Sequence, residues 1–536
     1  MKAQKKALPV APEADPIQVG SYFLETLTTG MYENPFHCIR EYVQNGYDAI
    51  NDAVRLGVLR HGEGRVLISI GGTARNTSLS VRDNGIGIPA TRAYTTLVSL
   101  GWSYKIPTQH AGFRGIGRLA GIAYCTTLRF KTKHKGEVQG TIVEYDCGRI
   151  RGFLKPGAEP QDVRNVVRSS VKHRPFDEAT DEHYTEVEMV GLTSLGLEFV
   201  DVDKLHPYLR QVCPVDYADS FDYADRVRAL AAGYGDTIGI IDVETRLKRE
   251  RVPIHKPYKN SAAVGGTKKA STSTLHDIET FTSKELGWYG WIGKSNFAGE
   301  ITDDTVAGVR FRMKNIQIGD SLLIEELAEE LTTSGTERRL QRWAVGEVFI
   351  TNTQVVPNAR RDGFEDNQAW REIRKDIKQK VAKRVVRLIR SASDARSILK
   401  KAAGACSELS LAISRQNVTS AEKSRIEGLV RRQIDILGSD KVLTGADPKE
   451  VSSLLSKFKE LQERLVKVRA DPPPPSPPTP PPQDGTGNFS AGGGGEPQGE
   501  QEEPSILDVV LEVLIEELGE EEAERLITLI EERLAG

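Results

Sequence analysis

The sequence predicts a mixed α/β protein in which an α/β sandwich domain is followed by a second α/β domain, a helical region and a tethered helical hairpin. Three observations predict this order. Residues 17–200 combine an amphipathic helical pattern with several short strand-like runs. From about Trp370 onward, apolar residues recur at steps of three and four, as they do in helices. Residues 472–482 contain nine prolines, and the Gly-rich stretch that follows has no hydrophobic stripe, which is typical of a linker.

These changes of pattern divide the chain into six predicted parts. They are a flexible N-terminus (1–16), the sandwich domain (17–215), a middle or transducer domain (216–370), a helical region (371–470), a Pro/Gly-rich linker (471–503) and an acidic helical hairpin (504–536).

In the first domain, Ile39, Val43 and Ile50 recur at helical spacing and predict a helix over residues 39–50. Strands are predicted at 66–70, 79–81, 127–131, 141–145 and 185–190. Residues 216–365 continue as short strands, and the Gly, Lys, Ser and Thr of Gly265–Ser273 predict a mobile loop.

The helical region begins with a strongly basic segment. Its apolar stripe consists of Ile373, Ile377, Val381, Val385 and Leu388. Residues 371–401 carry 12 basic and 3 acidic side chains, so the opposite face is positive. Three interpretations of this face stay open: a solvated surface, a contact with DNA phosphates, or a docking site for the acidic end of the same chain.

A second helix is predicted behind Asp447, with Pro448 in its first turn and Glu450 at the third position. Its apolar seam follows a heptad pattern: Val451, Leu454, Phe458, Leu461, Leu465 and Val468. This seam fits packing within the chain or a coiled-coil dimer. Residues 506–518 and 520–534 predict two short acidic helices.

Composition excludes several classes of protein. The 536 residues carry a net charge of −3, but residues 500–536 alone carry −11, so a basic body precedes an acidic tail. The five cysteines are scattered, which fits reduced thiols better than disulfides or a zinc site. No apolar run approaches the roughly 18–20 residues of a membrane helix, and no signal peptide is evident. We therefore expect a cytoplasmic protein without a membrane partner.

Three motifs within about eighty residues carry the chemistry. Glu41, Asn45 and Asp48 fall on one face of the predicted helix, where a carboxylate can activate a water and an amide oxygen can hold Mg²⁺. Asp83, at a strand end, can accept a hydrogen bond from an exocyclic amine, while Gly85 and Gly87 would let a planar ring approach the backbone.

The third motif is glycine-rich and opens a helix, where exposed backbone N–H groups favour an anion. Its predicted ligand residues are Gly112, Phe113, Arg114, Gly115, Ile116 and Gly117. Each motif alone is weak evidence, but together they supply a base and metal ligand, an adenine ligand and a phosphate cradle.

On these motifs the chain resembles the GHKL ATPases, which include gyrase, heat-shock protein 90, histidine kinases and MutL. The resemblance implies the Bergerat α/β sandwich and assigns ATP and Mg²⁺ as ligands. Glu41 would be the general base, and Asn45 the Mg²⁺ ligand. Asp48 would be a further cofactor-binding residue, and Asp83 would be the adenine acceptor, with Thr185 behind it. Lys105 resembles a lid lysine that contacts phosphate, in a lid over about residues 88–111.

Within this superfamily, the segment Val355–Asp362 resembles the middle domain of heat-shock protein 90, where an Asn-x-x-Arg turn carries a catalytic arginine. Arg361 is the candidate for that role and Arg360 is the alternative. If the arginine has no catalytic role, it would form a surface ion pair with Asp362. The resemblance implies a slow ATPase that acts as a homodimeric clamp on a protein client or partner. Two alternatives stay open: a MutL- or MORC-like ATPase that binds DNA through residues 371–401, and a nucleotide-dependent scaffold.

Overall fold

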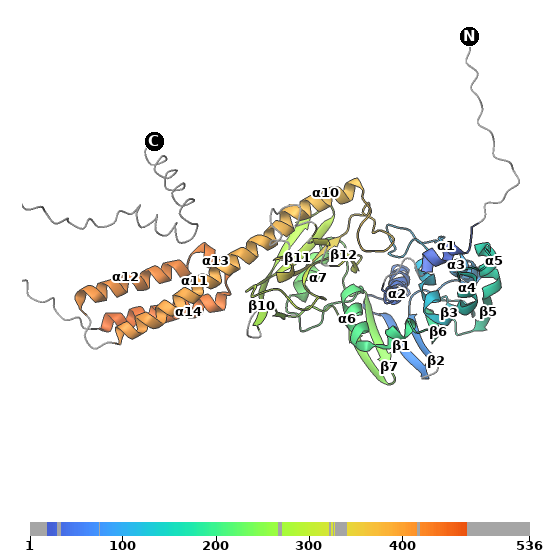
Figure 1. Cartoon of the computed structure of the whole chain (residues 1–536), viewed down its shortest axis with the longest axis horizontal. Helices are drawn as coiled ribbons and strands as arrows, with labels where there is room; N and C mark the ends of the chain where they lie inside the picture. The colour runs from blue at the N-terminus through green and yellow to red at the C-terminus, as the bar shows by residue number, and fades with distance from the viewer. Residues whose placement is uncertain are drawn as a thin grey trace, which may run out of the picture. The chain divides into compact units, whose positions relative to one another are not determined.

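The computed structural model describes residues 19–28, 34–73, 76–265, 271–320, 323–324, 326, 340–414 and 419–468 (Figure 1). The chain divides into two units, residues 1–473 and 474–536, and every described residue belongs to the first. The predicted flexible N-terminus, linker and acidic hairpin, and most of the predicted loop at Gly265–Ser273, lie outside the described residues. Within the described part of the chain, no helix has the length and apolar character needed to cross a membrane.

The first domain is built on an eight-stranded sheet with the order β5-β4-β3-β6-β2-β1-β7-β8. Its strands are β1 (Gly64–Thr73), β2 (Asn76–Asp83), β3 (Cys125–Lys133), β4 (Gln139–Asp146), β5 (Val171–Asp177), β6 (Tyr184–Leu192), β7 (Ile241–Leu247) and β8 (Glu250–Ile254). All neighbours pair antiparallel except β1 and β7, which are parallel. The five strands predicted for this domain are confirmed.

Strand β5 was not predicted, because its sequence does not alternate between apolar and polar residues. It lies at the edge of the sheet, and most of its side chains are exposed. Charged residues and Pro175 are tolerated there, since an edge strand has one unpaired side.

Helices pack against this sheet and enclose one core. The helical segments are α1 (Tyr22–Thr28), α2 (His37–Arg55), α3 (Ala90–Val98), η1 (Gly117–Ala123), α4 (Cys147–Phe153), α5 (Val163–Ser170), η2 (Gly196–Val200) and α6 (Val202–Val212). The next helix, α7 (Ala224–Ala232), packs instead in a buried cluster of the second domain. The predicted helix over 39–50 is the centre of α2, and Ile39, Val43 and Ile50 are fully buried. One face of α2 is therefore held against the sheet by apolar burial, which fixes the direction of its polar residues.

The second domain contains a six-stranded sheet with the order β13-β12-β14-β11-β10-β9. Its strands are β9 (Ser261–Val264), β10 (Ser271–Ser283), β11 (Trp288–Ser295), β12 (Gly308–Met313), β13 (Ile316–Ile318) and β14 (Val345–Ile350). The strand-rich character predicted for residues 216–365 is confirmed. Strands β7 and β8 lie in this range but extend the first sheet, so strand pairing crosses the predicted boundary at residue 215.

The helical region consists of α10 (Gln368–Ile377), the π-helical turn η4 (Lys378–Ala382), α11 (Lys383–Ile413), α12 (Ser420–Leu437), α13 (Asp440–Gly445) and α14 (Pro448–Lys467). The predicted stripe from Ile373 to Leu388 is buried against the second sheet. Asp447 caps α14 by accepting a hydrogen bond from Lys449 N at 2.8 Å, as predicted. The seam residues Val451 and Phe458 are buried in a cluster shared with α11 and α12, so the seam packs within the chain.

A buried group of charges joins the two domains around Glu347 on β14. Glu347 pairs with Lys256 at 2.9 Å and with Arg312 of β12. Arg312 also donates a hydrogen bond to Gln211 O of α6 at 3.0 Å. Burial alone would raise the pKa of Glu347, but Arg312 and Lys256 lower it to about 2. This network places the turn between β12 and β13, including Lys314, beside the first domain.

Candidate active site

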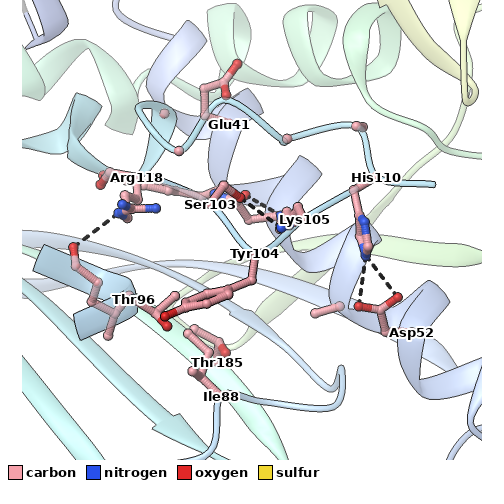
Figure 2. Close-up of a pocket in the computed structure, with 18 of the residues that line it drawn as sticks. Glu41, Asp52, Ile88, Thr96, Ser103, Tyr104, Lys105, His110, Arg118 and Thr185 are labelled. Carbon is pink, nitrogen blue, oxygen red and sulfur yellow. Dashed lines mark hydrogen bonds and ion pairs between the residues drawn. The ribbon is translucent and has the colours of Figure 1, made fainter. Parts of the chain in front are cut away.

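The three sequence motifs meet around one pocket of about 370 Å³. Its walls come from α2, β2 and the loop after it, α3, β6 and the lid segment. The lid was predicted over about residues 88–111, but α3 occupies part of that range, so we define the lid segment as residues 99–116. Ala359 and Arg361 of the second domain complete the lining (Figure 2 shows part of the pocket). The pocket therefore brings together residues that are more than 300 positions apart in the sequence.

Asp83 and Thr185 form one end of the pocket because β2 and β6 are neighbours and these two residues are paired in register. Asp83 Oδ1 accepts hydrogen bonds from Gly85 N at 2.8 Å and Thr185 N at 3.3 Å. Both bonds end on Oδ1, which leaves Oδ2 to accept a hydrogen bond from a ligand. Burial raises the pKa of Asp83 to about 6. Thr185 Oγ1 lies 3.0 Å from Thr132 Oγ1, which orients the threonine beside the carboxylate.

Gly85 and Gly87 lie in the loop after β2, where the backbone packs closely against its neighbours. A Cβ atom at Gly85 would lie 2.5 Å from Ala49 Cβ on α2. Gly87 has φ +72°, and a Cβ there would lie 1.9 Å from Lys133 O. These glycines let the loop pack closely against protein. Gly87 lines the pocket and Gly85 does not, and the approach of a planar ring to this loop stays a prediction.

Glu41, Asn45 and Asp48 share one face of α2, as predicted, but Asp48 does not line the pocket. Asp48 accepts hydrogen bonds from Ala111 N at 2.7 Å and Gly112 N at 2.9 Å. Burial would raise the pKa of Asp48, but Lys105 and the two backbone N–H groups lower it. In this structure Asp48 therefore fixes the lid instead of facing a ligand.

Lys105 reaches from the lid to this motif. Its Nζ donates to Asn45 Oδ1 at 2.9 Å and to Asp48 Oδ2 at 2.7 Å. The ammonium group thus lies at the end of the pocket where Glu41 and Asn45 are found, which is the end predicted to receive phosphate.

The glycine motif lines the pocket through Gly112 and residues 114–117, whereas Phe113 does not line it. Phe113 packs under Arg114, whose guanidinium carbon is 4.8 Å from the centre of its ring. Gly117 begins η1, and a Cβ atom there would lie 2.2 Å from Glu41 Oε2. A side chain at residue 117 would therefore displace the carboxylate that is the candidate base.

Arg361 extends from the second domain into the pocket. Its Nη2 donates to Ala111 O at 2.6 Å, and its Nε lies 3.5 Å from Glu41 Oε1. The side chain is buried, and its backbone has φ +62°, a conformation that is uncommon for a residue with a side chain. Arg360 is exposed and does not line the pocket, and Asp362 bonds to Asn358, so the geometry favours Arg361 as the pocket arginine.

Two residues that hold the lid were not predicted. Lys314 Nζ donates to His110 O at 2.7 Å and to Pro107 O at 3.0 Å. His110 Nε2 lies 3.0 Å from Asp52 Oδ2 of α2 (Figure 2). Lys314 lies in a turn and has φ +51°. The local sequence around this turn does not indicate that it contacts the lid, which lies about 200 residues earlier in the chain.

The residues at this end of the pocket fit a Mg²⁺ ion held mainly by a ligand. Asn45 Oδ1 is a hard oxygen donor, and Mg²⁺ typically takes one or two protein oxygens together with phosphate oxygens and water. Within the described part of the chain, no group of three or more His, Cys, Asp or Glu residues could hold a metal by itself. A metal bound here would therefore need oxygens from a phosphate.

Residues 32–151 match a family model described as histidine kinase-, DNA gyrase B- and HSP90-like ATPase. The match spans the segment from α2 to α4 and includes the polar residues of α2, Asp83 and the glycine motif. The chain thus contains a GHKL-superfamily ATPase domain, in a mixed α/β structure with a helical C-terminal region. No curated protein matches the chain significantly.

Proposed function

We propose that this protein is an ATP-hydrolysing molecular clamp resembling heat-shock protein 90, which closes its lid on ATP and acts on a protein client or partner as a homodimer. The observation that carries the proposal is Arg361. It comes from the second domain yet lies within 3.5 Å of Glu41, the candidate general base of the ATPase domain. An arginine delivered from a second domain can make hydrolysis depend on how the two domains are arranged.

Each end of the pocket has a role in this reaction. Asp83 accepts a hydrogen bond from the exocyclic amine of adenine through Oδ2, with Thr185 beside it. The backbone of the glycine motif and Lys105 receive the phosphates, and Asn45 holds Mg²⁺, which neutralises phosphate charge when bound. Glu41 accepts the proton of the attacking water.

Arg361 stabilises the charge that develops on the transferred phosphoryl group. Before ATP binds, its guanidinium faces Glu41 and the lid carbonyl of Ala111. A γ-phosphate entering between them offers a stronger partner for the arginine than a carbonyl does. This exchange of partners also releases Glu41 to engage the water.

Contacts between the domains support a mechanical output. Arg114 of the glycine motif donates to Pro357 O at 2.7 Å and Asn358 O at 3.3 Å, next to the turn that carries Arg361. The phosphate-binding backbone is therefore bonded directly to the second domain. The exposed Tyr22 and Phe23 of α1 offer apolar surface for a second copy of the chain.

The basic segment 371–401 is the basis of the alternative in which DNA is the partner. Part of its charge is already used within the chain: Arg384 pairs with Glu279 at 2.8 Å, and Lys380 with Asp376 at 2.9 Å. Arg396 donates to backbone carbonyl groups of residues 296 and 297. These contacts leave fewer cations of the segment available to neutralise DNA phosphates, and so fewer counterions would be released from the DNA on binding.

The test measures ATP binding and Mg²⁺-dependent hydrolysis for the wild type, Glu41→Ala, Arg361→Ala and the matched control Arg360→Ala. We expect ATP binding by all four proteins and turnover at the wild-type rate by Arg360→Ala. Glu41→Ala should show no detectable turnover, and Arg361→Ala should lose about 10³-fold. A wild type that does not bind ATP refutes the proposal. Binding without any turnover favours the scaffold.

Two further assays on the same protein distinguish a DNA partner from a protein client. Stimulation of the ATPase by DNA that disappears with added salt would favour a DNA-associated enzyme. Activity that ignores DNA, together with ATP-dependent suppression of the aggregation of an unfolded protein, would favour the chaperone-like clamp.

A further inference from the structure

We propose that Tyr104 of the lid is the base-stacking residue of this pocket and that its ring lies against the purine of the bound nucleotide. This inference rests on the proposed function, because it assigns a further ligand contact within the same site. The lid would then contact both the base and the phosphates of the nucleotide.

Tyr104 lies at the end of the pocket defined by Asp83 and Thr185. Its side chain lines the cavity, and Figure 2 shows its ring extending from the lid toward Ile88 and Thr185. The sheet side of this end is apolar apart from Asp83 and Thr185, with Val81, Phe130 and Val187 in the lining, and Ile88 follows β2. A base whose amine bonds to Asp83 comes within reach of the ring, because both groups line one cavity.

The exposure of Tyr104 leaves its aromatic ring available to a ligand. Three large apolar side chains of the lid are exposed: Trp102 by 63%, Tyr104 by 56% and Ile106 by 49%. Trp102 does not line the pocket, whereas Tyr104 and Ile106 do. Stacking a planar base on Tyr104 would remove an aromatic face from water, and every nucleobase has such a face.

Neighbouring contacts hold the ring in this position. The next residue, Lys105, is bonded to Asn45 and Asp48 at the opposite end of the pocket, which anchors the lid backbone. The guanidinium carbon of Arg92 on α3 lies 5.6 Å from the centre of the Tyr104 ring, a cation–π distance. Adjacent lid residues thus reach both ends of the site, the ring toward the base and the ammonium toward the phosphates.

The pocket also contains a buried hydroxyl group that lacks a hydrogen-bond partner in the described structure. Thr96 lines the pocket from α3, and its buried Oγ1 has no hydrogen-bond partner in the described structure. Buried hydroxyl groups are normally satisfied, so a ring nitrogen of the base or a ribose hydroxyl is the expected partner.

The test titrates the full chain with ATP and, separately, with inorganic tripolyphosphate, which has the phosphates without the base. We expect Tyr104→Ala to raise the Kd for ATP at least about tenfold and to leave the Kd for tripolyphosphate within about twofold. Tyr104→Phe and Tyr104→Trp should stay within about threefold of the wild type, since each keeps an aromatic face. Trp102→Ala is the matched control and should bind ATP like the wild type.

Several outcomes overturn the inference while the proposed function stands. Equal ATP binding by wild type and Tyr104→Ala shows that the ring does not touch the base. Tighter binding by the variant shows that the ring blocks the site, and an equal loss for both ligands shows that the change disturbs the lid as a whole. If the wild type binds neither ligand, the inference and the proposed function fail together.

Discussion

Replacing Lys314 by methionine should loosen the lid, because this lysine is the unexpected link between the second domain and the lid backbone. Its ammonium group donates to His110 O at 2.7 Å and to Pro107 O at 3.0 Å. Methionine keeps an unbranched side chain of similar length but removes both hydrogen bonds. The variant therefore changes the contact without changing the space that the side chain fills.

The size of the effect follows from these two bonds. A hydrogen bond with a charged donor contributes about 1.5–3 kcal/mol, and the half-buried position of Lys314 places each bond toward the lower end of this range. Both bonds come from one ammonium group, so their contributions are less than additive, and together they bias the lid toward its closed form by about 2–3 kcal/mol. This corresponds to a factor of about 30 to 150 in the ratio of closed to open lid.

Hydrogen exchange measures this ratio directly at lid amides whose bonds require the closed form. Ala111 N donates to Asp48 at 2.7 Å, and Gly112 N donates to Asp48 at 2.9 Å. Both amides should exchange about 30 to 150 times faster in Lys314→Met. Lys248→Met is the matched control, since Lys248 is an exposed lysine that also has a positive φ, at +57°.

Unchanged exchange at both amides in Lys314→Met would refute the reasoning, because it would mean that other contacts alone hold the lid. Faster exchange that appears equally in Lys248→Met would refute it too, since the effect would then come from the turn conformation and not from the lid contact.

Three further predictions concern other parts of the molecule. The pKa of Asp83 is raised to about 6, so ATP affinity should fall as the pH drops through 6 and the carboxylate gains a proton; calorimetry should show this dependence in the wild type and not in Asp83→Asn. Gly117→Ala places a Cβ against Glu41, so hydrolysis should fall at least about tenfold in a steady-state assay. Glu347→Ala leaves two buried cations unpaired, so the second domain should lose about 3–5 kcal/mol of stability, seen as easier proteolysis.

Much of the local structure could be predicted because its cause lies in neighbouring residues. The spacing of Ile39, Val43 and Ile50 predicted α2, and the same periodicity placed Glu41 and Asn45 on a common face at the pocket. The helix around 448–467 and its cap followed from side chains that bond to backbone a few residues away. Helical period, strand alternation and capping are short-range properties, so one sequence carries them in full.

The residues that line the pocket could be predicted only in part. Asp83 and the glycines of residues 112–117 were found because each follows a recognisable turn or strand end. Asp48 was predicted as a cofactor ligand, but its carboxylate bonds to the lid backbone. A helix face shows which residues point the same way, but it cannot show which of them a distant loop will cover.

The sequence by itself determined the α/β character, the helical C-terminal region and the candidate catalytic face of α2. Only the tertiary structure decided that β7 pairs with β1, that Lys314 holds the lid, and that Arg361 rather than Arg360 enters the pocket. These facts depend on contacts between segments about 180 to 320 residues apart, which buried charges and apolar packing bring together. Local sequence patterns do not indicate such long-range contacts, because the free energy of these contacts comes from burial that exists only once the whole chain has folded.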